Sequence, residues 1–555
     1  METKLNNRAN AHLHGASKSS PVEDEKSGVP QAHLLTRVSR RFSLGALLCF
    51  GFALFYSLYN WLPLLDAKWS LIDDHEIVAV IGLNDKLPIS EIPAALGKTE
   101  IANTGGSVRF RPSYYTLRFL EAATWGKQPQ FWYASRIAIS VLFALVLTSL
   151  CLRLGGSILT FGFLFFELSR PYWADIFSRL GPAETYAVFG LSLIMLGFIA
   201  SAKRRWSALS CAVIALGIVI AAGSKENFII LAALPLWLFF SPAVRLSLVM
   251  KSIFGIVLVY LGWIFITVFR RVQHAGYDVY ERPVSIESRF GLLHSLATRP
   301  DVLVWLSICL SLLVLVYVLK NRDEQMRVLS KSLNGYIWAM LVLLLVFAIQ
   351  YVFYFGAWPR GAAPRYLFPG VFGQHFAIFL AVVIVAKIIS VTSPWLRGRS
   401  WIVLLAAASC FLTFSVKNFA TNRAASKTVV ANTISFTSKL KEAFDFLRMN
   451  PSAALILNSN NVSDYEPLFS IERFVRASGL TNPVALKLNG YSPEAFSKDS
   501  QRLAFSLAGT LEEIQKFGKA GFVPLRTVET IAACFSMGMS GPPLASCESG
   551  NIIRP

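Results

Sequence analysis

Residues 42–76 read FSLGALLCFGFALFYSLYNWLPLLDAKWSLIDDHE, and this stretch decides the class of fold. Its first part, 42–63, is apolar and long enough to cross a bilayer core, which takes about 20 residues of helix. No small-residue cleavage site follows the run, which indicates a retained membrane anchor rather than a removed signal peptide. Three acids and a histidine then stand at 73–76. The stretch predicts a membrane protein and leaves two interpretations of 73–76, a solvated turn or a functional site.

The composition of the whole chain agrees with a membrane protein. Of its 555 residues, 54% are hydrophobic and 15% are charged, and the mean hydropathy is +0.50. A soluble protein of this length needs more polar surface. Lys and Arg (53) exceed Asp and Glu (33) by 20, but many basic residues flank apolar runs, where topology and anionic lipids explain them. No nucleic-acid motif is present, so no nucleic-acid partner is expected.

Eleven apolar stretches are predicted to be transmembrane helices. Basic segments at 37–42, 202–206, 320–331 and 395–401 all fall in the cytoplasm when the amino terminus lies inside, as the distribution of positive charge in membrane proteins requires. The predicted spans are 42–63, 133–152, 156–169, 184–201, 206–222, 226–241, 252–270, 301–319, 334–355, 367–389 and 400–416.

This topology divides the chain into three parts. Residues 1–41 are polar and form a disordered cytoplasmic tail, and 42–416 form the transmembrane domain with a long first outer loop at 64–132. Residues 417–555 are polar and lie outside as a small α/β domain. In this domain Cys534 and Cys547 close a short polar loop, and an extracytoplasmic location predicts a disulfide between them.

The outer loops carry more cations than the topology alone explains. Positive charge is normally retained on the cytoplasmic side, so basic residues outside need another reason, and an anionic ligand supplies one. The planar fork of arginine suits phosphate oxygens at the depth of lipid headgroups. The outer basic residues are Arg109, Arg111, Arg179, Lys225, Arg270, Arg271, Arg360 and Arg365.

Carboxylates and cations on one membrane face favour one kind of chemistry. A carboxylate at Asp73 or Asp74 can take the proton of a hydroxyl nucleophile, while cations stabilise charge on a departing phosphate. Inverting transfer of a sugar from a phosphate needs little more, since phosphate leaves without a strong general acid.

With these features the chain resembles the GT-C superfamily of integral-membrane glycosyltransferases, which use polyprenyl-phosphate-linked sugars. The resemblance covers about 40–420 and rests on the layout and on the acidic pair in LIDDHE (71–76), RFRP (109–112), RLGPAE (179–184) and GSKE (223–226). The chain lacks the Asp-Glu form of the lipid A aminoarabinose transferases and protein O-mannosyltransferases. It also lacks the WWD signature of oligosaccharyltransferases, so those activities are not implied.

The resemblance implies an all-α polytopic core of about eleven transmembrane helices with a small extracytoplasmic α/β carboxy-terminal domain. It implies transfer of a hexosyl or pentosyl group from a polyprenyl-phosphate donor to a lipid or glycan acceptor, on the periplasmic face of a bacterial inner membrane. The general base falls on Asp73 or Asp74, with Asp73 preferred, and no cofactor is implied. The expected substrate-binding residues are Glu76, Arg109, Arg111, Arg179, Glu184, Lys225, Glu226, Arg270, Arg271, Arg360, Arg365 and Tyr366.

Simpler interpretations stand beside several of these roles. Lys225 and Glu226 suit an ion pair that closes a hairpin, and Glu184 suits a helix's first turn. The aromatic residues between 114 and 132 suit interface anchors, and the segment 114–126 suits an amphipathic helix in the interface. Arg270 and Arg271 are equally suited to snorkelling toward headgroups.

A divalent metal bound by residues 73–76 is an alternative, but adjacent side chains point apart and rarely converge on one ion. Two other functions compete with the enzyme. A transporter of an anionic solute or lipid usually shows matched halves and charges near the bilayer midplane, and neither is evident in the sequence. A scaffold would use 417–555 to bind a partner.

Overall fold

The computed structural model describes most of the membrane domain and part of the carboxy-terminal segment. All helices and strands below belong to one compact unit, Leu44–Pro555. The tail at 1–41, the span predicted at 301–319, Arg360 and the Cys534–Cys547 disulfide lie outside the described residues. The described residues are 43–102, 108–203, 206–240, 246–276, 324–352, 364–392, 401–451, 455–459, 465–482 and 484–488, with the single positions 287, 291, 294 and 399.

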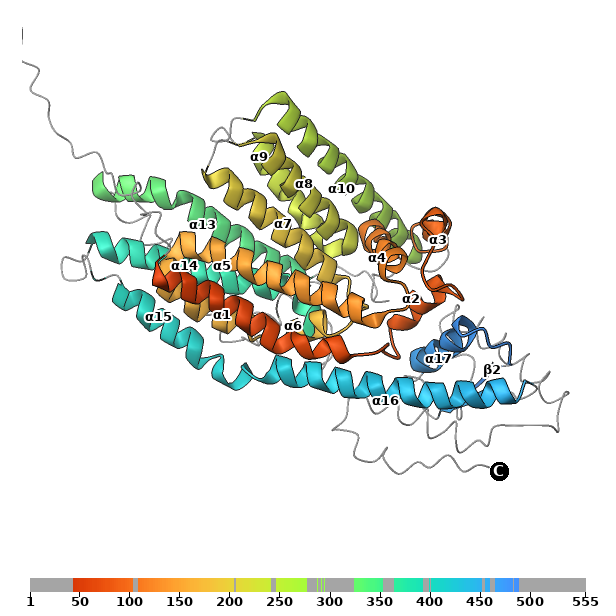
Figure 1. Ribbon diagram of the computed structural model, residues 1–555. Coiled ribbons are helices and arrows are strands. Elements are labelled where there is room, and N and C mark those ends of the chain that lie inside the picture. Colours follow the sequence, from red (N-terminus) through yellow and green to blue (C-terminus); the bar gives the residue numbers. More distant parts are fainter. Residues whose placement is uncertain are drawn as a thin grey trace, which may run out of the picture. The chain divides into compact units, whose positions relative to one another are not determined.

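Helices dominate the described chain (Figure 1). The first half contains α1 (Leu44–Trp61), η1 (Leu62–Asp66), α2 (Asp74–Ile81), η2 (Ile89–Glu91), α3 (Ile92–Leu96), α4 (Pro112–Trp125), α5 (Pro129–Leu168), α6 (Tyr172–Phe177), α7 (Glu184–Lys203), α8 (Ala208–Ser224), η3 (Glu226–Ala232), α9 (Ala233–Phe240) and α10 (Leu248–Ala275). The second half contains α13 (Glu324–Gln350), η5 (Pro364–Leu367), α14 (Gly370–Thr392), α15 (Trp401–Thr413), η6 (Val416–Asn418), α16 (Thr421–Met449), β1 (Leu455–Ser459), α17 (Tyr465–Ala477) and β2 (Val484–Leu488).

Six of the described helices are long and apolar enough to cross a membrane, and a bent pair, α15 with the helix that follows it, makes a seventh if it counts as one span. Helix α8 and the segment Glu226–Phe240 are apolar but shorter. The helical, polytopic character is therefore confirmed, whereas the predicted count of eleven spans is not. The six lie at Leu44–Asp66, Pro129–Leu168, Glu184–Ser201, Leu248–Ala275, Leu333–Gln350 and Gly370–Ser390.

Helix α5 contains two legs that fold back on each other at Gly156, whose φ of 71° and ψ of 179° are not helical. The ring of Phe143 lies 5.6 Å from Phe372, and the ring of Phe163 lies 5.9 Å from Phe376. The two partners on α14 are one helical turn apart, whereas 20 residues of straight α5 would separate the two phenylalanines by roughly 30 Å. The fold-back agrees with the prediction of separate spans at 133–152 and 156–169.

The legs of α5 form the centre around which other helices pack. Helices α1, α7 and α15 contact α5, while α13 packs along α14 and α8 lies between α7 and α10. The resulting core is rich in aromatic side chains, among them Phe163 and Trp173, which have no exposed surface or almost none.

The first outer loop folds into short helices, and α4 is its longest element. The predicted helix at 114–126 is present as α4, and the structure shows that one side of it packs inside the protein. Helix α4 contacts α8, α3, α2 and α5, and it buries the charged residues Arg118 and Glu121 as well as Phe119. A charged side chain inside the protein must find polar partners, and these partners organise the site described below.

Two of the expected interface anchors are in fact core residues. Tyr114 and Trp132 are 5% and 0% exposed, because their polar atoms bond to carbonyl oxygens inside the protein. The Tyr114 hydroxyl donates to the carbonyl of Gly181, and the Trp132 indole donates to that of Gly126. Phe131 remains 52% exposed, as an anchor would be.

The described part of the carboxy-terminal segment contains the long helix α16, the helix α17 and two parallel strands, β1 and β2. Buried apolar residues of α16 and α17, such as Phe436 and Phe474, form one cluster with Leu71, Ile72 and Val78 of the first loop. The carboxy-terminal segment therefore supports the acidic stretch directly. A complete α/β domain over 417–555 is not shown by these elements.

Candidate functional site

The site is centred on Asp73, the last residue before α2. Asp73 has φ +69° and is the one residue other than glycine with a positive φ in the described part of the chain. Its carbonyl oxygen accepts hydrogen bonds from Arg118 Nη2 at 2.8 Å and from the Glu76 amide at 3.3 Å. A backbone in this region is strained and persists only where the surroundings hold it, which is common at functional sites.

The Asp73 carboxylate meets an arginine from a later loop. Asp73 Oδ2 lies 2.6 Å from Nη2 of Arg179, and the two side chains are 27% and 25% exposed. Arg179 also lies 3.3 Å from Asp175 of α6, which in turn lies 3.4 Å from the guanidinium of Arg365. Acids and arginines thus alternate in a chain formed by three separate segments. We call Asp73, Asp175, Arg179 and Arg365 the carboxylate–arginine cluster.

A glycine makes the contact between Asp73 and the RLGP segment possible. A Cβ atom on Gly181 would lie 2.2 Å from Asp73 Cβ and 2.3 Å from its Cγ. These are atoms near the base of a short side chain, so they have little freedom to move away. The RLGPAE motif therefore contributes a cation at Arg179 and, two residues later, the space into which the aspartate fits.

Arg118 is a central residue that the sequence analysis did not single out. It is 2% exposed, and its guanidinium donates to the carbonyls of Leu180 and Asp73 at 2.9 and 2.8 Å. It thereby ties the RLGP segment to the strained turn. The sequence did contain a signal for this role, because Arg118 lies one turn after Tyr114 on the apolar face of α4. A charged residue on a buried face needs polar partners inside the protein.

Arg118 adds a positive charge beside the carboxylate–arginine cluster, which is itself neutral. Burial alone would raise the pKa of Asp73, but Arg179, Arg365 and Arg118 together hold it below its ordinary value. Asp73 is therefore ionised at neutral pH. The four cluster residues are neutral together, and the guanidinium of Arg118 beside them brings the local sum to 3 − 2 = +1, which favours an additional anion.

Asp74 occupies a different environment from its neighbour. It is 0% exposed, and its Oδ2 accepts the Ser70 amide at 2.7 Å. Its Oδ1 has no hydrogen-bond partner among the described residues. Because the Asp74 carboxyl lies inside the protein, its pKa is raised to about 7. It is therefore only half ionised near neutrality.

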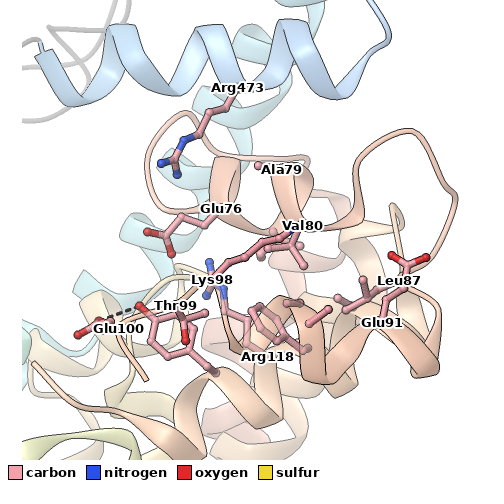
Figure 2. Close-up of a pocket in the computed structure, with 16 residues that line it drawn as sticks. Glu76, Ala79, Val80, Leu87, Glu91, Lys98, Thr99, Glu100, Arg118 and Arg473 are labelled. Atoms are coloured by element: carbon pink, nitrogen blue, oxygen red, sulfur yellow. Dashed lines mark hydrogen bonds between the residues drawn. The ribbon is translucent and has the colours of Figure 1, made fainter. Parts of the chain in front are cut away.

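His75 and Glu76 are also shifted by burial. Desolvation, with help from Arg473, lowers the pKa of His75 to about 4, which keeps the imidazole neutral at physiological pH. This agrees with a hydrogen-bonding role rather than proton transfer. Burial raises the pKa of Glu76, whose side chain lines a cavity between α2 and α4 (Figure 2).

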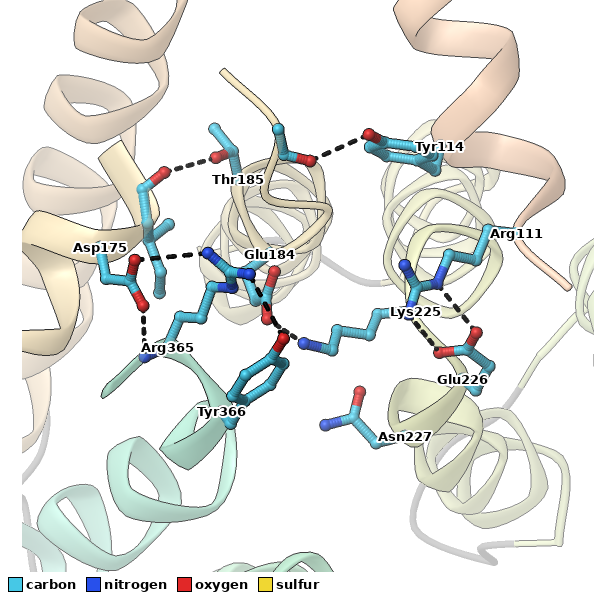
Figure 3. A network of polar contacts seen from close by, with 12 residues as sticks. Arg111, Tyr114, Asp175, Glu184, Thr185, Lys225, Glu226, Asn227, Arg365 and Tyr366 are labelled. Carbon is cyan, nitrogen blue, oxygen red and sulfur yellow. Dashed lines mark hydrogen bonds and ion pairs between the residues drawn. The ribbon is translucent and has the colours of Figure 1, made fainter. Parts of the chain in front are cut away.

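The other outer-loop charges form two pairs (Figure 3). Glu226 receives a two-point contact from Arg111, at 2.8 and 3.2 Å. Lys225 bonds to Glu184, and both side chains are 2% exposed. The expected ion pair between Lys225 and Glu226 is therefore replaced by two pairs that join the end of α8 to α7 and to the start of α4.

Tyr366 and Arg365 bring η5 to the same region. The ammonium of Lys225 lies 4.9 Å from the centre of the Tyr366 ring, and the guanidinium of Arg365 lies 5.0 Å from it. The backbone amide of Arg365 also donates to Asp175. Glu184, Lys225 and Tyr366 thus lie beside Arg365 of the carboxylate–arginine cluster, as the prediction of a shared outer face requires.

Three of the predicted arginines do not contact the carboxylate–arginine cluster in the described structure. Arg271 donates to the carbonyl of Arg109 and lies over the ring of Phe110 at 5.1 Å, so it fixes the start of the RFRP segment. Arg270 is exposed on the last turns of α10. Arg360 lies outside the described residues.

Two buried polar groups deeper in the helices were not predicted. Glu121 of α4 accepts both terminal nitrogens of Arg136 at 2.8 and 2.9 Å, and the Tyr186 hydroxyl bonds to both partners. Glu167 of α5 bonds to the Tyr172 hydroxyl and lies 2.7 Å from Nδ1 of His375. These groups fix α4, α6, α7 and α14 against α5, and so they position the cluster above them.

No cluster of three or more His, Cys, Asp or Glu side chains with the geometry of a metal site occurs within the described ranges.

Comparison of the chain with models of protein families, with curated proteins and with solved structures finds no match. The resemblance to the GT-C superfamily therefore stays a prediction, and the geometry of the site carries the functional argument.

The site combines the ionised, partly exposed carboxylate of Asp73 with the guanidinium groups of Arg179 and Arg365. Such an arrangement can accept a proton from a hydroxyl and can bind an anion next to it. Asp73 is the member of the acidic pair that can meet a ligand, because the carboxyl of Asp74 faces the interior.

Proposed function

We propose that this protein is an integral-membrane glycosyltransferase of the GT-C type. It moves a sugar from a polyprenyl-phosphate donor to a hydroxyl of a lipid or glycan acceptor on the outer face of the membrane. The contact of 2.6 Å between Asp73 and Arg179 carries the proposal, because it joins the first-loop acid to a phosphate-binding type of side chain from a later loop.

In this mechanism Asp73 takes the proton of the acceptor hydroxyl. The hydroxyl oxygen forms a bond to the anomeric carbon from the face opposite the phosphate, and the bond from that carbon to the phosphate oxygen breaks with its electrons going to the phosphate. Arg179 and Arg365 stabilise the charge on the leaving phosphate. Attack from the opposite face inverts the configuration of the sugar.

The resting ion pair gives the donor a part in activating the base. An arginine that faces Asp73 lowers the basicity of its carboxylate. When a donor phosphate binds Arg179, it competes for the same guanidinium, and the carboxylate regains basicity next to the acceptor hydroxyl. Asp74 is a positioning residue in this scheme, since its buried carboxyl holds the Ser70 amide in the turn.

The proposal extends to topology and location. The cluster faces the periplasm of a bacterial inner membrane, and 417–555 forms a small α/β domain on the same side with the Cys534–Cys547 disulfide. The support is the distribution of basic segments along the sequence and the packing of α16 and α17 on the first loop.

The test is sugar transfer by the purified protein in lipid nanodiscs, supplied with a panel of radiolabelled polyprenyl-phosphate sugars and with membranes as the source of acceptor. Asp73→Asn is expected to lower the initial rate by about 10²–10⁴-fold, the usual contribution of a general base. Asp85→Asn, an exposed carboxylate of the same loop, is the matched control. Transfer at the full rate by Asp73→Asn and Asp74→Asn would exclude the proposal.

A further inference from the structure

A cavity of about 560 Å³ lies beside the acidic turn, and no residue of the carboxylate–arginine cluster lines it. We call it the α2–α4 cavity, because these two helices supply half of the residues that line it and α3 closes it (Figure 2). Arg473 of α17 projects toward it from above. A volume of this size accommodates a ligand of a few rings.

The polar groups of the cavity are arranged to meet a ligand. Glu76 is half-buried in this wall, where burial raises its pKa against the opposing charges of Arg118 and Arg473. No hydrogen bond or close ion pair of its carboxylate occurs among the described residues. Arg118 also lines the cavity, and its Nε atom has no partner in the described chain. A buried donor and a nearby acceptor that lack partners cost free energy unless a ligand or water satisfies them.

The rest of the wall is apolar and partly aromatic. Ile77, Leu87 and Phe119 are buried residues of this wall, and Tyr115 adds a ring whose hydroxyl donates to Glu100 at 2.7 Å. Acceptor and donor groups beside an apolar, ring-bearing wall match a sugar, which has a rim of hydroxyls and flat C–H faces. A lipid chain would leave both polar groups unsatisfied. Three acids and three basic residues line the cavity, so it has no net charge that would select an anion; they are Glu76, Glu91, Glu100, Lys98, Arg118 and Arg473.

The cavity is connected to the proposed catalytic base through two short links. Glu76 follows Asp73 by three residues in the first turn of α2, and its amide bonds to the Asp73 carbonyl. Arg118 contributes to the wall of the cavity and bonds to the same carbonyl. A ligand in the cavity therefore contacts residues that hold the strained turn.

We propose that the α2–α4 cavity binds a sugar residue of the acceptor, with Glu76 accepting hydrogen bonds from its hydroxyls and Arg118 donating to them. The identity of this sugar as part of the acceptor rests on the proposed function. The binding of a saccharide in the cavity does not depend on transfer. It makes the acceptor a glycan or glycolipid rather than a simple alcohol or a protein side chain.

The test is saturation-transfer NMR with a panel of methyl glycosides of hexoses and N-acetylhexosamines, added to the full-length protein in nanodiscs without any donor. At least one glycoside is expected to bind to the wild type, and Glu76→Gln is expected to weaken this binding about tenfold or more, since a hydrogen bond to a charged group is lost. Ala94→Trp, which enters the cavity from an exposed position on α3, is expected to abolish binding.

Asp85→Asn is the control and retains the wild-type signal, and empty nanodiscs give none. Absence of binding by every glycoside, or equal binding by the wild type, Glu76→Gln and Ala94→Trp, would overturn the assignment. The outcomes separate the two proposals. If glycosides bind but the protein is inactive with every donor, the cavity assignment stands and the transferase proposal is excluded. Transfer that needs Asp73 but has an unchanged acceptor KM in Glu76→Gln excludes the cavity alone.

Discussion

At the scale of single residues, the two adjacent aspartates have opposite electrostatic roles. Asp73 is ionised and partly exposed beside arginines, while Asp74 is buried with its pKa raised to about 7. Sequence reasoning identified the pair and preferred Asp73, but it had no access to this difference, which depends on which side chain turns inward after a residue with positive φ.

The raised pKa of Asp74 predicts a pH-dependent stability. The folded state retains the proton where the unfolded state has lost it, so the free energy of unfolding falls as the pH rises from about 4 to about 7, by about 4 kcal/mol in total. Asp74→Asn removes this penalty and keeps the acceptor for Ser70. We expect the Tm of the variant to exceed that of the wild type by a margin that grows between pH 5 and pH 8.

Thermal unfolding in detergent at a series of pH values measures this margin. Asp85→Asn changes an exposed carboxylate of the same loop and should differ from the wild type by a constant amount or not at all. A constant margin for Asp74→Asn would show that its carboxyl is not protonated in the folded protein.

A second prediction at this scale concerns Gly181. Gly181→Ala requires either Asp73 or the RLGP segment to move, because the added Cβ would overlap the base of the aspartate side chain. A displacement of about 1 Å at a catalytic group costs roughly 10²-fold in rate. Initial transfer rates measure the effect, and Gly262→Ala on α10, where a Cβ meets nothing within 4 Å, is the control. Wild-type activity of Gly181→Ala would place the reaction elsewhere.

At the scale of helices, apolar runs predicted the elements well but not their environments. The first apolar run appears as α1, and the break at Gly156 divides α5 where two spans were expected. Helix α4 shows what pattern reasoning misses. Its polar residues Arg118 and Glu121 are buried, because they bond to groups on α5, α7 and the RLGP segment that lie far away in sequence.

The pairing of charges between helices was equally invisible in the sequence. Topology predicted that Glu184, Lys225, Glu226 and Arg111 share one face, and the structure brings them together. Which acid meets which base depends on how α7, α8 and α4 pack, and one sequence does not contain that information. The buried pair of Lys225 and Glu184 is for this reason better explained as a joint between α7 and α8 than as a ligand site.

This explanation predicts a stability defect. Glu184→Gln removes the carboxylate that faces a buried ammonium, which costs about 3–5 kcal/mol. The double variant Glu184→Gln, Lys225→Met should recover most of the lost Tm, because the buried charge is removed as well. If the residues serve a ligand instead, Glu184→Gln will retain its Tm and lose affinity for phosphate.

At the scale of the whole molecule, the carboxy-terminal segment stabilises the acidic turn. Residues of α16 and α17 share an apolar cluster with Leu71, Ile72 and Val78, and the Ser470 hydroxyl bonds to the Leu71 carbonyl. Composition predicted a separate outer domain over 417–555. The first part of this segment packs against the first loop, and the described residues do not test whether the whole of 417–555 forms a domain.

Loosening this contact should therefore affect a loop far away in sequence. Phe474 is 4% exposed and lies 5.4 Å from the ring of Phe436. We expect Phe474→Ala to speed amide hydrogen exchange across residues 70–81, because the turn loses its support from α17. Met449→Ala, a change at a residue that is 74% exposed, should leave exchange unchanged. Unchanged exchange in both variants would show that the loop holds its conformation without α17.

In the proposed mechanism Asp73 and Arg179 share one anion site. Affinity for a polyprenyl monophosphate, measured by native mass spectrometry on the protein in nanodiscs, tests it most directly, because the two residues should act with opposite signs. Arg179→Ala should weaken binding about tenfold or more. Asp73→Asn should tighten it, since the competing carboxylate is gone, although transfer is lost. Unchanged affinity in both variants would contradict the claim.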